Sequence, residues 1–330
     1  MANIAVIGSG GWGTAVAIHL DGKGYDVTLW SWKQEECDNI LRDGENKEFL
    51  PGVKVPDTIK LTSDISCVKD KDLVVLVSPS KVIRQTARSM APHITEGTPV
   101  VILSKGIEDE TLMTLSQVVE EEIPQAKVAA LSGPSHAEEV ARKIPTTCVV
   151  ACECEKTAQF IQNIFMSENF RIYTNTDVLG VELGGALKNV IALCAGVTDG
   201  IGFGDNTIAA LMTRGIKEIA RLGVKMGAEV ETFYGLAGIG DLIVTCTSKH
   251  SRNRRAGVLI GKGMKLKEAL DEVHMVVEGV YAAKAAYKLS LKYDVEMPIV
   301  SEAYNVLFND ASPKDAIISL MTRDKKVETE

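Results

Sequence analysis

Three glycines have the spacing of a loop that binds the phosphates of a nucleotide. Gly8, Gly10 and Gly13 follow the apolar run of residues 3–7 and precede an Ala-rich helical pattern that continues to about Leu20. The first glycine permits a tight strand-to-helix turn, the second lets the backbone approach a pyrophosphate, and the third lets helix and strand pack closely. Because a helix N-terminus attracts anions, the pattern predicts a dinucleotide site. The alternative is an ordinary glycine-rich turn.

The segment after the second predicted strand, residues 26–30, bears on the choice of coenzyme. NAD sites usually carry Asp or Glu there, which accepts a hydrogen bond from the ribose 2′-hydroxyl. Here Ser31, Trp32 and Lys33 follow the strand, and the first acid is Glu35. A hydroxyl and a cation suit a 2′-phosphate, so this segment favours NADPH without excluding NADH. The alternative is that Lys33 is an ordinary solvent-exposed lysine.

Lys105 and Asp241 each lie in a predicted turn where a charged group could contact a substrate. Lys105 follows the predicted strand 99–103, so we expect it at the carboxyl edge of the sheet, where it could hold a substrate oxygen or phosphate. Asp241 follows Gly238 and Gly240, and it could pair with a catalytic lysine or bind a substrate hydroxyl. The alternatives are an exposed loop lysine and an ordinary turn aspartate.

Lys188 lies in a helical pattern that contains two adjacent glycines. At helical spacing Gly184, Gly185 and Lys188 share one face with Ala192 and Ala195. Two glycines cost a helix about 1–2 kcal/mol relative to alanine, which indicates that something approaches the backbone closely. A lysine on this face could be a general acid aimed at a carbonyl oxygen. The alternative is helix–helix packing, with the lysine extending outward.

Two further loops could hold an anion. Gly133 and Ser135 follow the predicted strand 127–131 and offer a hydroxyl and backbone N–H groups, although Ser135 with Glu138 also fits a helix capping box. The basic stretch that begins Ser251-Arg252-Asn253 leads into a predicted helix, 251–262. Cations in a first helical turn oppose the helix dipole unless an anion lies there, so this stretch favours a phosphate site. A nucleic-acid site is the alternative, and the acidic chain around it argues against that.

These residues require strands that bring their ends to one edge and a helix that carries Lys188. Apolar, β-branched runs alternate with helical segments in the first half, and helical periodicity dominates after about residue 175. The sequence therefore predicts an α/β fold: a Rossmann-type, mostly parallel sheet domain over residues 1–176 and an all-helical domain over residues 177–330. The predicted strands are 3–7, 26–30, 72–77, 99–103, 127–131 and 146–151.

Composition limits the classes of function. The chain has 330 residues with 45% apolar and 24% charged content and a net charge of −8, which fits a globular protein and argues against a nucleic-acid partner. Its seven cysteines lack a zinc pattern and indicate reduced thiols in the cytoplasm, with no metal dependence. We expect no signal peptide and no membrane insertion, because the apolar runs read as too short or interrupted.

Taken together, these motifs resemble the bacterial NAD(P)-dependent sn-glycerol-3-phosphate dehydrogenases, and the resemblance covers essentially the whole chain. The segments that carry it, in order, are 8–15, 104–107, 132–139, 182–190, 235–242, 251–253 and 277–279.

The resemblance implies reversible reduction of dihydroxyacetone phosphate to sn-glycerol 3-phosphate, which feeds phospholipid synthesis. Lys188 corresponds to the catalytic proton donor or acceptor. Substrate contacts correspond to Lys105, Gly133, Ser135, Lys188, Asp241, Ser251, Arg252 and Asn253. Coenzyme contacts, beside the glycines Gly8, Gly10 and Gly13, correspond to Gly11, Trp12, Lys33, Lys105, Ala137, Arg252, Val276 and Glu278. Gly11 departs from the serine that relatives often have, which removes a side-chain contact.

Two alternatives stay open. One is a related dehydrogenase of a β-hydroxy acid such as 6-phosphogluconate or 3-hydroxyisobutyrate, and the other is a non-catalytic NAD(P)-binding sensor. The sequence also leaves the oligomeric state open, with a homodimer among the alternatives.

Overall fold

The computed structural model describes residues 2–328, which divide into two compact units. Unit 1 is the chain up to Gly185 together with Glu231–Asp241, and unit 2 is Ala186–Val230 together with the chain from Leu242 onward. The division differs from the predicted one at residues 176 and 177, because the first turns of helix α7 (Val178–Ile201) belong to unit 1. Val181 of these turns is buried in an apolar cluster with residues of the sheet and of the 236–240 segment.

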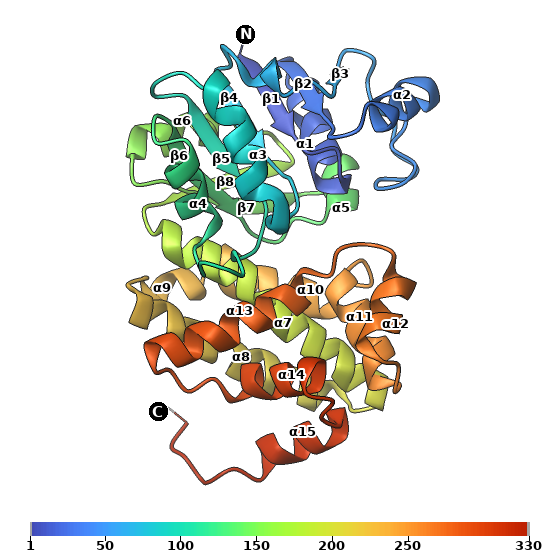
Figure 1. The fold of residues 1–330 in the computed structure, drawn as a ribbon, viewed down its shortest axis with the longest axis vertical. Helices are drawn as coiled ribbons and strands as arrows, with labels where there is room; N and C mark the ends of the chain where they lie inside the picture. The colour runs from blue at the N-terminus through green and yellow to red at the C-terminus, as the bar shows by residue number, and fades with distance from the viewer. Residues whose placement is uncertain (1, 329–330) are drawn as a thin grey trace. The chain divides into compact units, whose positions relative to one another are not determined.

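Unit 1 is built on an eight-stranded sheet in the order β3-β2-β1-β4-β5-β6-β7-β8 (Figure 1). Neighbouring strands are parallel except β6 and β7, which are antiparallel. The strands are β1 (Asn3–Ile7), β2 (Asp26–Trp30), β3 (Lys60–Thr62), β4 (Leu73–Leu76), β5 (Pro99–Ile102), β6 (Lys127–Ser132), β7 (Thr146–Ala151) and β8 (Phe170–Asn175). The sequence reading missed β3 and β8, because β3 is short and β8 alternates buried and exposed residues.

Helices cover both faces of this sheet. Ile4 and Val6 of β1 share an apolar cluster with α1 and α6, whereas Ala5 and Ile7 share another with α3 and α4. The helices of this part of the chain are α1 (Gly11–Gly22), α2 (Gln34–Asp43), α3 (Ile83–Met90), α4 (Leu115–Glu122), α5 (Ala137–Ala141), α6 (Glu155–Phe165) and α9 (Val230–Phe233). Short 3₁₀ turns η1 (Ile65–Val68), η2 (Ser80–Val82) and η3 (Ala91–His93) and a π-helix η4 (Leu236–Gly240) complete it.

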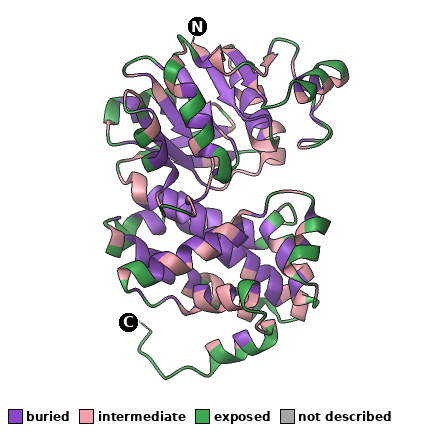
Figure 2. Ribbon diagram, in the orientation of Figure 1, coloured by how far each residue is buried: buried purple, intermediate pink, exposed green. Residues whose placement is uncertain are grey.

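Unit 2 consists of helices joined by loops, with no strand among the residues that the structure describes. Beside the rest of α7 it contains α8 (Asp205–Met226), α10 (Asp241–Thr247, from its second residue), α11 (Arg252–Gly261), α12 (Leu266–Val273), α13 (Glu278–Tyr293), α14 (Pro298–Phe308) and α15 (Pro313–Met321). Contrary to the sequence reading, α7 is long and apolar enough to cross a membrane, but most of it is buried inside the protein (Figure 2). It is a core helix.

Helices α7 and α11 touch backbone to backbone through glycines spaced four residues apart. Gly196 and Gly200 of α7 face Gly257 and Gly261 of α11. A Cβ on Gly257 would lie 2.1 Å from the carbonyl oxygen of Leu193, which is closer than any real contact allows. The two helices can therefore be this close only because these positions lack side chains.

Gly257→Ala is expected to destabilise unit 2 by about 1–3 kcal/mol or more, because two backbones must separate to admit one methyl group. Urea unfolding followed by circular dichroism measures the change. Gly22→Ala is the control, because a Cβ there meets nothing within 4 Å. Equal stabilities for the two variants would contradict this account of the helix contact.

Glu218 of α8 is a buried carboxyl at the N-terminus of α14. It is 3% exposed and accepts hydrogen bonds from the backbone N–H groups of Ile299 (2.9 Å) and Val300 (3.3 Å). Burial nevertheless raises the pKa of Glu218 to about 7, because the protein interior disfavours its charged form.

A carboxyl whose pKa is higher in the folded chain binds protons more tightly there, so its stabilising effect is lost as the pH rises from about 4.5 to 7. We expect wild type to lose about 3 kcal/mol through this group over that range, and Glu218→Gln to lose none of it. Urea unfolding of both proteins at pH 5 and pH 8 measures the difference. Parallel losses in the two proteins would show that Glu218 does not titrate in this way.

Candidate active site

The glycine loop of unit 1 has the shape that a dinucleotide needs. Gly8 has a φ of +129°, and a Cβ on Gly13 would lie 1.8 Å from the carbonyl oxygen of Gly8. Gly10 precedes α1, and a Cβ there would meet nothing within 4 Å. The turn is thus closed by two glycines and open at the third, which fits a pyrophosphate at the N-terminus of α1.

The structure explains why position 11 is a glycine in this chain. A Cβ at this position would lie 2.4 Å from the carbonyl oxygen of Phe49 and 3.8 Å from the side chain of Ala137. The 46–50 segment is in turn fastened to the loop, because Asn46 donates to the carbonyl oxygen of Ser9 at 2.7 Å. A serine at position 11 would require that segment to move.

The structure removes one argument for an NADPH preference. Ser31, which was expected to offer a free hydroxyl to a 2′-phosphate, donates instead to the carboxylate of Glu36. Ser9 of the glycine loop lies 2.8 Å from the same carboxylate oxygen. An acid is therefore present beside the ends of β1 and β2. Lys33 is the N-cap residue of α2, and its Nζ lies 4.3 Å from the ring centre of Trp32, which is 68% exposed.

Lys105, which is half-buried, and Asp241, which is buried, form an ion pair in unit 1. The Lys105 Nζ lies 2.6 Å from Asp241 Oδ2 and 3.0 Å from the carbonyl oxygen of Gly133, and Asp241 is 2% exposed. Ser135 donates to the same Gly133 oxygen at 2.9 Å. The predicted substrate contacts of unit 1 (Lys105, Gly133, Ser135 and Asp241) thus lie in one cluster. The expected capping box is wrong, because His136 is the N-cap residue of α5 and Ser135 bonds to Gly133.

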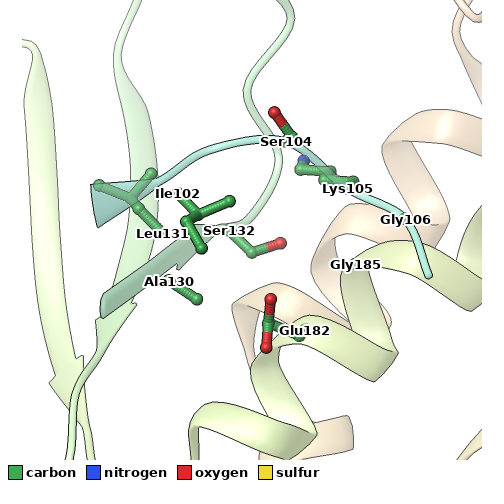
Figure 3. A pocket seen from close by; sticks show the side chains of 9 residues that line it. All are labelled: Ile102, Ser104, Lys105, Gly106, Ala130, Leu131, Ser132, Glu182 and Gly185. Carbon is green, nitrogen blue, oxygen red and sulfur yellow. The ribbon is translucent and has the colours of Figure 1, made fainter. Parts of the chain in front are cut away.

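A small pocket lies beside Lys105. Figure 3 shows Ser132, at the end of β6, and Glu182, on α7, among its lining side chains. The hydroxyl of Ser132 is buried without a hydrogen-bond partner among residues 2–328, and the pocket has room for about one water molecule. Glu182 accepts from the backbone N–H of Ser116 at 2.9 Å near the N-terminus of α4, and burial raises the pKa of its carboxyl. It thereby anchors α7 to the end of the loop that carries Lys105.

The paired glycines of α7 are explained by packing within unit 1. A Cβ on Gly184 would lie 2.9 Å from the carbonyl oxygen of Ala237, and one on Gly185 would lie 2.5 Å from the hydroxyl of Ser132. The close approach that the sequence predicts is therefore an approach by the protein itself. It allows the first turns of α7 to lie against η4 and the end of β6.

In unit 2, Lys188 is 5% exposed and donates to the hydroxyl of Thr245 on α10. The next residue, Asn189, accepts a hydrogen bond from the side chain of Asn253 at 2.8 Å. Asn253 also accepts from the backbone N–H of Gly279 at 2.8 Å. Lys188 and the start of α11 are consequently held together by a buried network that joins α7, α11 and α13.

The start of α11 has the features of an anion site. Ser251 is the N-cap residue and accepts from the backbone N–H of Arg254 at 3.2 Å, while Arg252 is an exposed cation in the first turn. Glu278 begins α13, and Val276, two residues before it, is 38% exposed. The Asn253 side chain uses its oxygen and one of its two amide hydrogens in the network above, so an anion could meet the second amide hydrogen.

Sequence reasoning missed three residues of this region: Glu36, Glu182 and Asn189. Glu182 carried a signal, because an acid between two apolar helix residues, Val181 and Leu183, indicates a buried partner. The other two carried none, because polar residues in a helix are more often solvent-exposed. Among residues 2–328, no group of three or more His, Cys, Asp or Glu could hold a metal ion, and the seven cysteines form no disulfide.

Comparison with known proteins decides the family. Residues 3–158 match the model of the NAD-dependent glycerol-3-phosphate dehydrogenase N-terminus, and residues 177–318 match that of the C-terminus. The chain belongs to the NAD-dependent glycerol-3-phosphate dehydrogenase family. Among curated members, glycerol-3-phosphate dehydrogenase [NAD(P)+] of Agathobacter rectalis is 55% identical over 99% of this chain and 98% of its own length. The Moorella thermoacetica protein of the same name is 54% identical over the same shares.

Solved structures of this family have the same fold. The crystal structure of glycerol-3-phosphate dehydrogenase from Coxiella burnetii superposes with a TM-score of 0.94 at 36% identity, over 98% of this chain and 99% of that one. A yeast glycerol-3-phosphate dehydrogenase superposes with a TM-score of 0.84 at 27% identity, over 98% and 99%. Structures of 2-dehydropantoate 2-reductases, at 13–15% identity, share the fold alone. The predicted Rossmann-type sheet followed by helices is confirmed.

Proposed function

We propose that this chain catalyses the reversible reduction of dihydroxyacetone phosphate to sn-glycerol 3-phosphate with NADH or NADPH. The observation that carries the proposal is the network of unit 2, which ties the buried Lys188 to the arginine-bearing N-terminus of α11 through Asn189 and Asn253. A proton donor and a phosphate anchor on one rigid framework suit a small phosphorylated ketone.

The proton step belongs to Lys188. Its ammonium group donates to the carbonyl oxygen as negative charge develops there, and it takes the proton back in the reverse direction. The hydroxyl of Thr245 orients the lysine. Arg252 and the first N–H groups of α11 hold the phosphate, because charge-assisted hydrogen bonds and the helix dipole both favour an anion there.

The residues of unit 1 bind and orient. Lys105, held by Asp241 at 2.6 Å, offers a charge to a substrate oxygen. Gly133 and Ser135 line the same cluster. The coenzyme's pyrophosphate would be held at Gly10 and the N-terminus of α1, with Trp12, Lys33 and Ala137 as further contacts. Val276 and Glu278, which belong to unit 2, are the other proposed coenzyme contacts. When bound, the coenzyme supplies or accepts the hydride at the carbonyl carbon.

The direct test is oxidation of NADH and of NADPH, each with and without dihydroxyacetone phosphate. Substrate-dependent oxidation is the expected result. Turnover of a β-keto acid in place of the ketose phosphate would favour the alternative of a β-hydroxy acid dehydrogenase. Coenzyme binding without turnover of either compound would favour a non-catalytic NAD(P)-binding sensor.

Arg252→Ala is expected to raise the KM for dihydroxyacetone phosphate by about tenfold or more, because each charge-assisted hydrogen bond contributes about 1.5–3 kcal/mol. The kcat should change less, since the phosphate is bound in the ground state as well as in the transition state. Steady-state kinetics with varied ketose phosphate measure both. Arg255→Ala, also exposed on α11, is the control; a similar rise in KM there would argue against a specific anchor.

We also propose that the enzyme works in the cytoplasm without membrane insertion and supplies glycerophospholipid synthesis. Its expression should relieve the growth requirement of a bacterial strain that depends on added glycerol phosphate. A homodimer stays a prediction, which analytical ultracentrifugation tests.

A further inference from the structure

A carboxylate lies at the point where the glycine loop meets the end of the second strand. Glu36, in the first turn of α2, accepts hydrogen bonds at Oε2 from Ser31 and from Ser9, the latter at 2.8 Å. The two serine hydroxyls also lie 2.8 Å apart, and these residues are 0% and 5% exposed, respectively. The acid is therefore fixed to both strand ends by two buried hydroxyls.

The second oxygen of this carboxylate has capacity left. Within residues 2–328, Oε1 of Glu36 has no hydrogen-bond partner, and the residue is only half-buried. Of its two anchors, Ser9 lies between Gly8 and Gly10, and Ser31 follows β2. Strand β2 pairs with β1, so the two anchors lie at neighbouring strand ends. This is where a dinucleotide-binding fold presents an acid to the ribose 2′-hydroxyl, although here the acid comes from the helix rather than from the end of the strand.

We propose that Glu36 accepts a hydrogen bond from the ribose 2′-hydroxyl and that this chain consequently binds NADH more tightly than NADPH. The inference rests on the proposed use of a nicotinamide coenzyme and names the form that the site selects. A 2′-phosphate brings two negative charges next to the carboxylate. The carboxylate cannot turn away without leaving a buried hydroxyl hydrogen with no acceptor, because the two serines could then bond only to each other.

Lys33 is the group that could reverse this selection. It is exposed, and its Nζ lies over the ring of Trp32 rather than beside Glu36. Exposed ion pairs contribute little because water screens them. The anchored acid therefore outweighs the exposed cation.

The test measures coenzyme binding to the full chain without substrate, by titration of NADH and NADPH in a calorimeter. Wild type should bind NADH more tightly, by about tenfold or more. In Glu36→Gln that ratio should fall by about tenfold or more, because the amide can still accept from the serines but no longer repels a phosphate. Ser31→Ala, which removes one of the two anchors of the acid, should shift the ratio in the same direction by a smaller amount. Glu35→Gln, the exposed neighbour in the same turn, should leave it unchanged.

Tighter binding of NADPH by wild type, or an unchanged ratio in Glu36→Gln, would overturn the inference. These outcomes are distinct from failure of the proposed function, in which both coenzymes bind but dihydroxyacetone phosphate is not reduced. Thermal unfolding of each variant shows that it is folded at the temperature of the titration.

Discussion

Lys188→Met is expected to lower kcat for dihydroxyacetone phosphate by about 10²–10⁴-fold, the usual contribution of a general acid. The residue is 5% exposed and donates a hydrogen bond to Thr245, so the protein and not solvent fixes the position of its ammonium group. Methionine has a similar length and fills the same space. Without the ammonium group, the oxygen that gains charge as hydride arrives has no positioned proton donor.

The measurement is steady-state kinetics, together with the Kd for NADH. Because Lys188 acts on the ketone, coenzyme affinity should stay close to that of wild type. Lys225→Met, at the exposed end of α8, is the control. Near-normal turnover in Lys188→Met would assign the proton to another group.

Thr245 offers a finer test of the same step. Thr245→Val removes the hydroxyl that holds the lysine and keeps the shape of the side chain. We expect a smaller loss of kcat than in Lys188→Met and little change in KM, because the acid remains but is less well positioned.

Asp241→Ala is expected to destabilise the protein by about 3 kcal/mol and to lower kcat/KM as well, because it leaves the Lys105 ammonium group, whose side chain is 18% exposed, without its counter-charge. Asp241 is 2% exposed, and its oxygen lies 2.6 Å from Lys105 Nζ. After the change, Lys105 keeps its hydrogen bond to the carbonyl oxygen of Gly133, at 3.0 Å. A neutral carbonyl group stabilises the lysine charge less than a carboxylate does where little water is present.

A double variant separates stability from catalysis. Lys105→Met with Asp241→Leu replaces the ion pair by apolar groups, so stability should largely return while activity stays low. Urea unfolding and kcat/KM are measured on the same preparations. Asp26→Ala is the control, since its partner Lys60 is 63% exposed and such surface pairs contribute about 1 kcal/mol or less. Full recovery of activity in the double variant would show that the pair only supports the fold.

The amino-acid sequence by itself determined the features that depend on neighbours along the chain. The glycine loop, six of the eight strands and the lysine-bearing helix follow from glycine spacing and apolar periodicity. Local backbone geometry dictates those patterns. Lys105 was likewise expected at the carboxyl edge of the sheet, because parallel strands must end together there.

Tertiary structure decided which side chains meet across long stretches of sequence. The two glycines of α7 indicated a close approach, but only packing shows that Ser132 and the Ala237 backbone occupy the space. The pairing of Lys105 with Asp241 joins residues 136 positions apart. In the sequence, Glu36 is indistinguishable from an ordinary surface acid; only the packing of α2 places it against Ser9 and Ser31. Such partners depend on how elements pack in three dimensions, and periodicity along the chain carries no record of that.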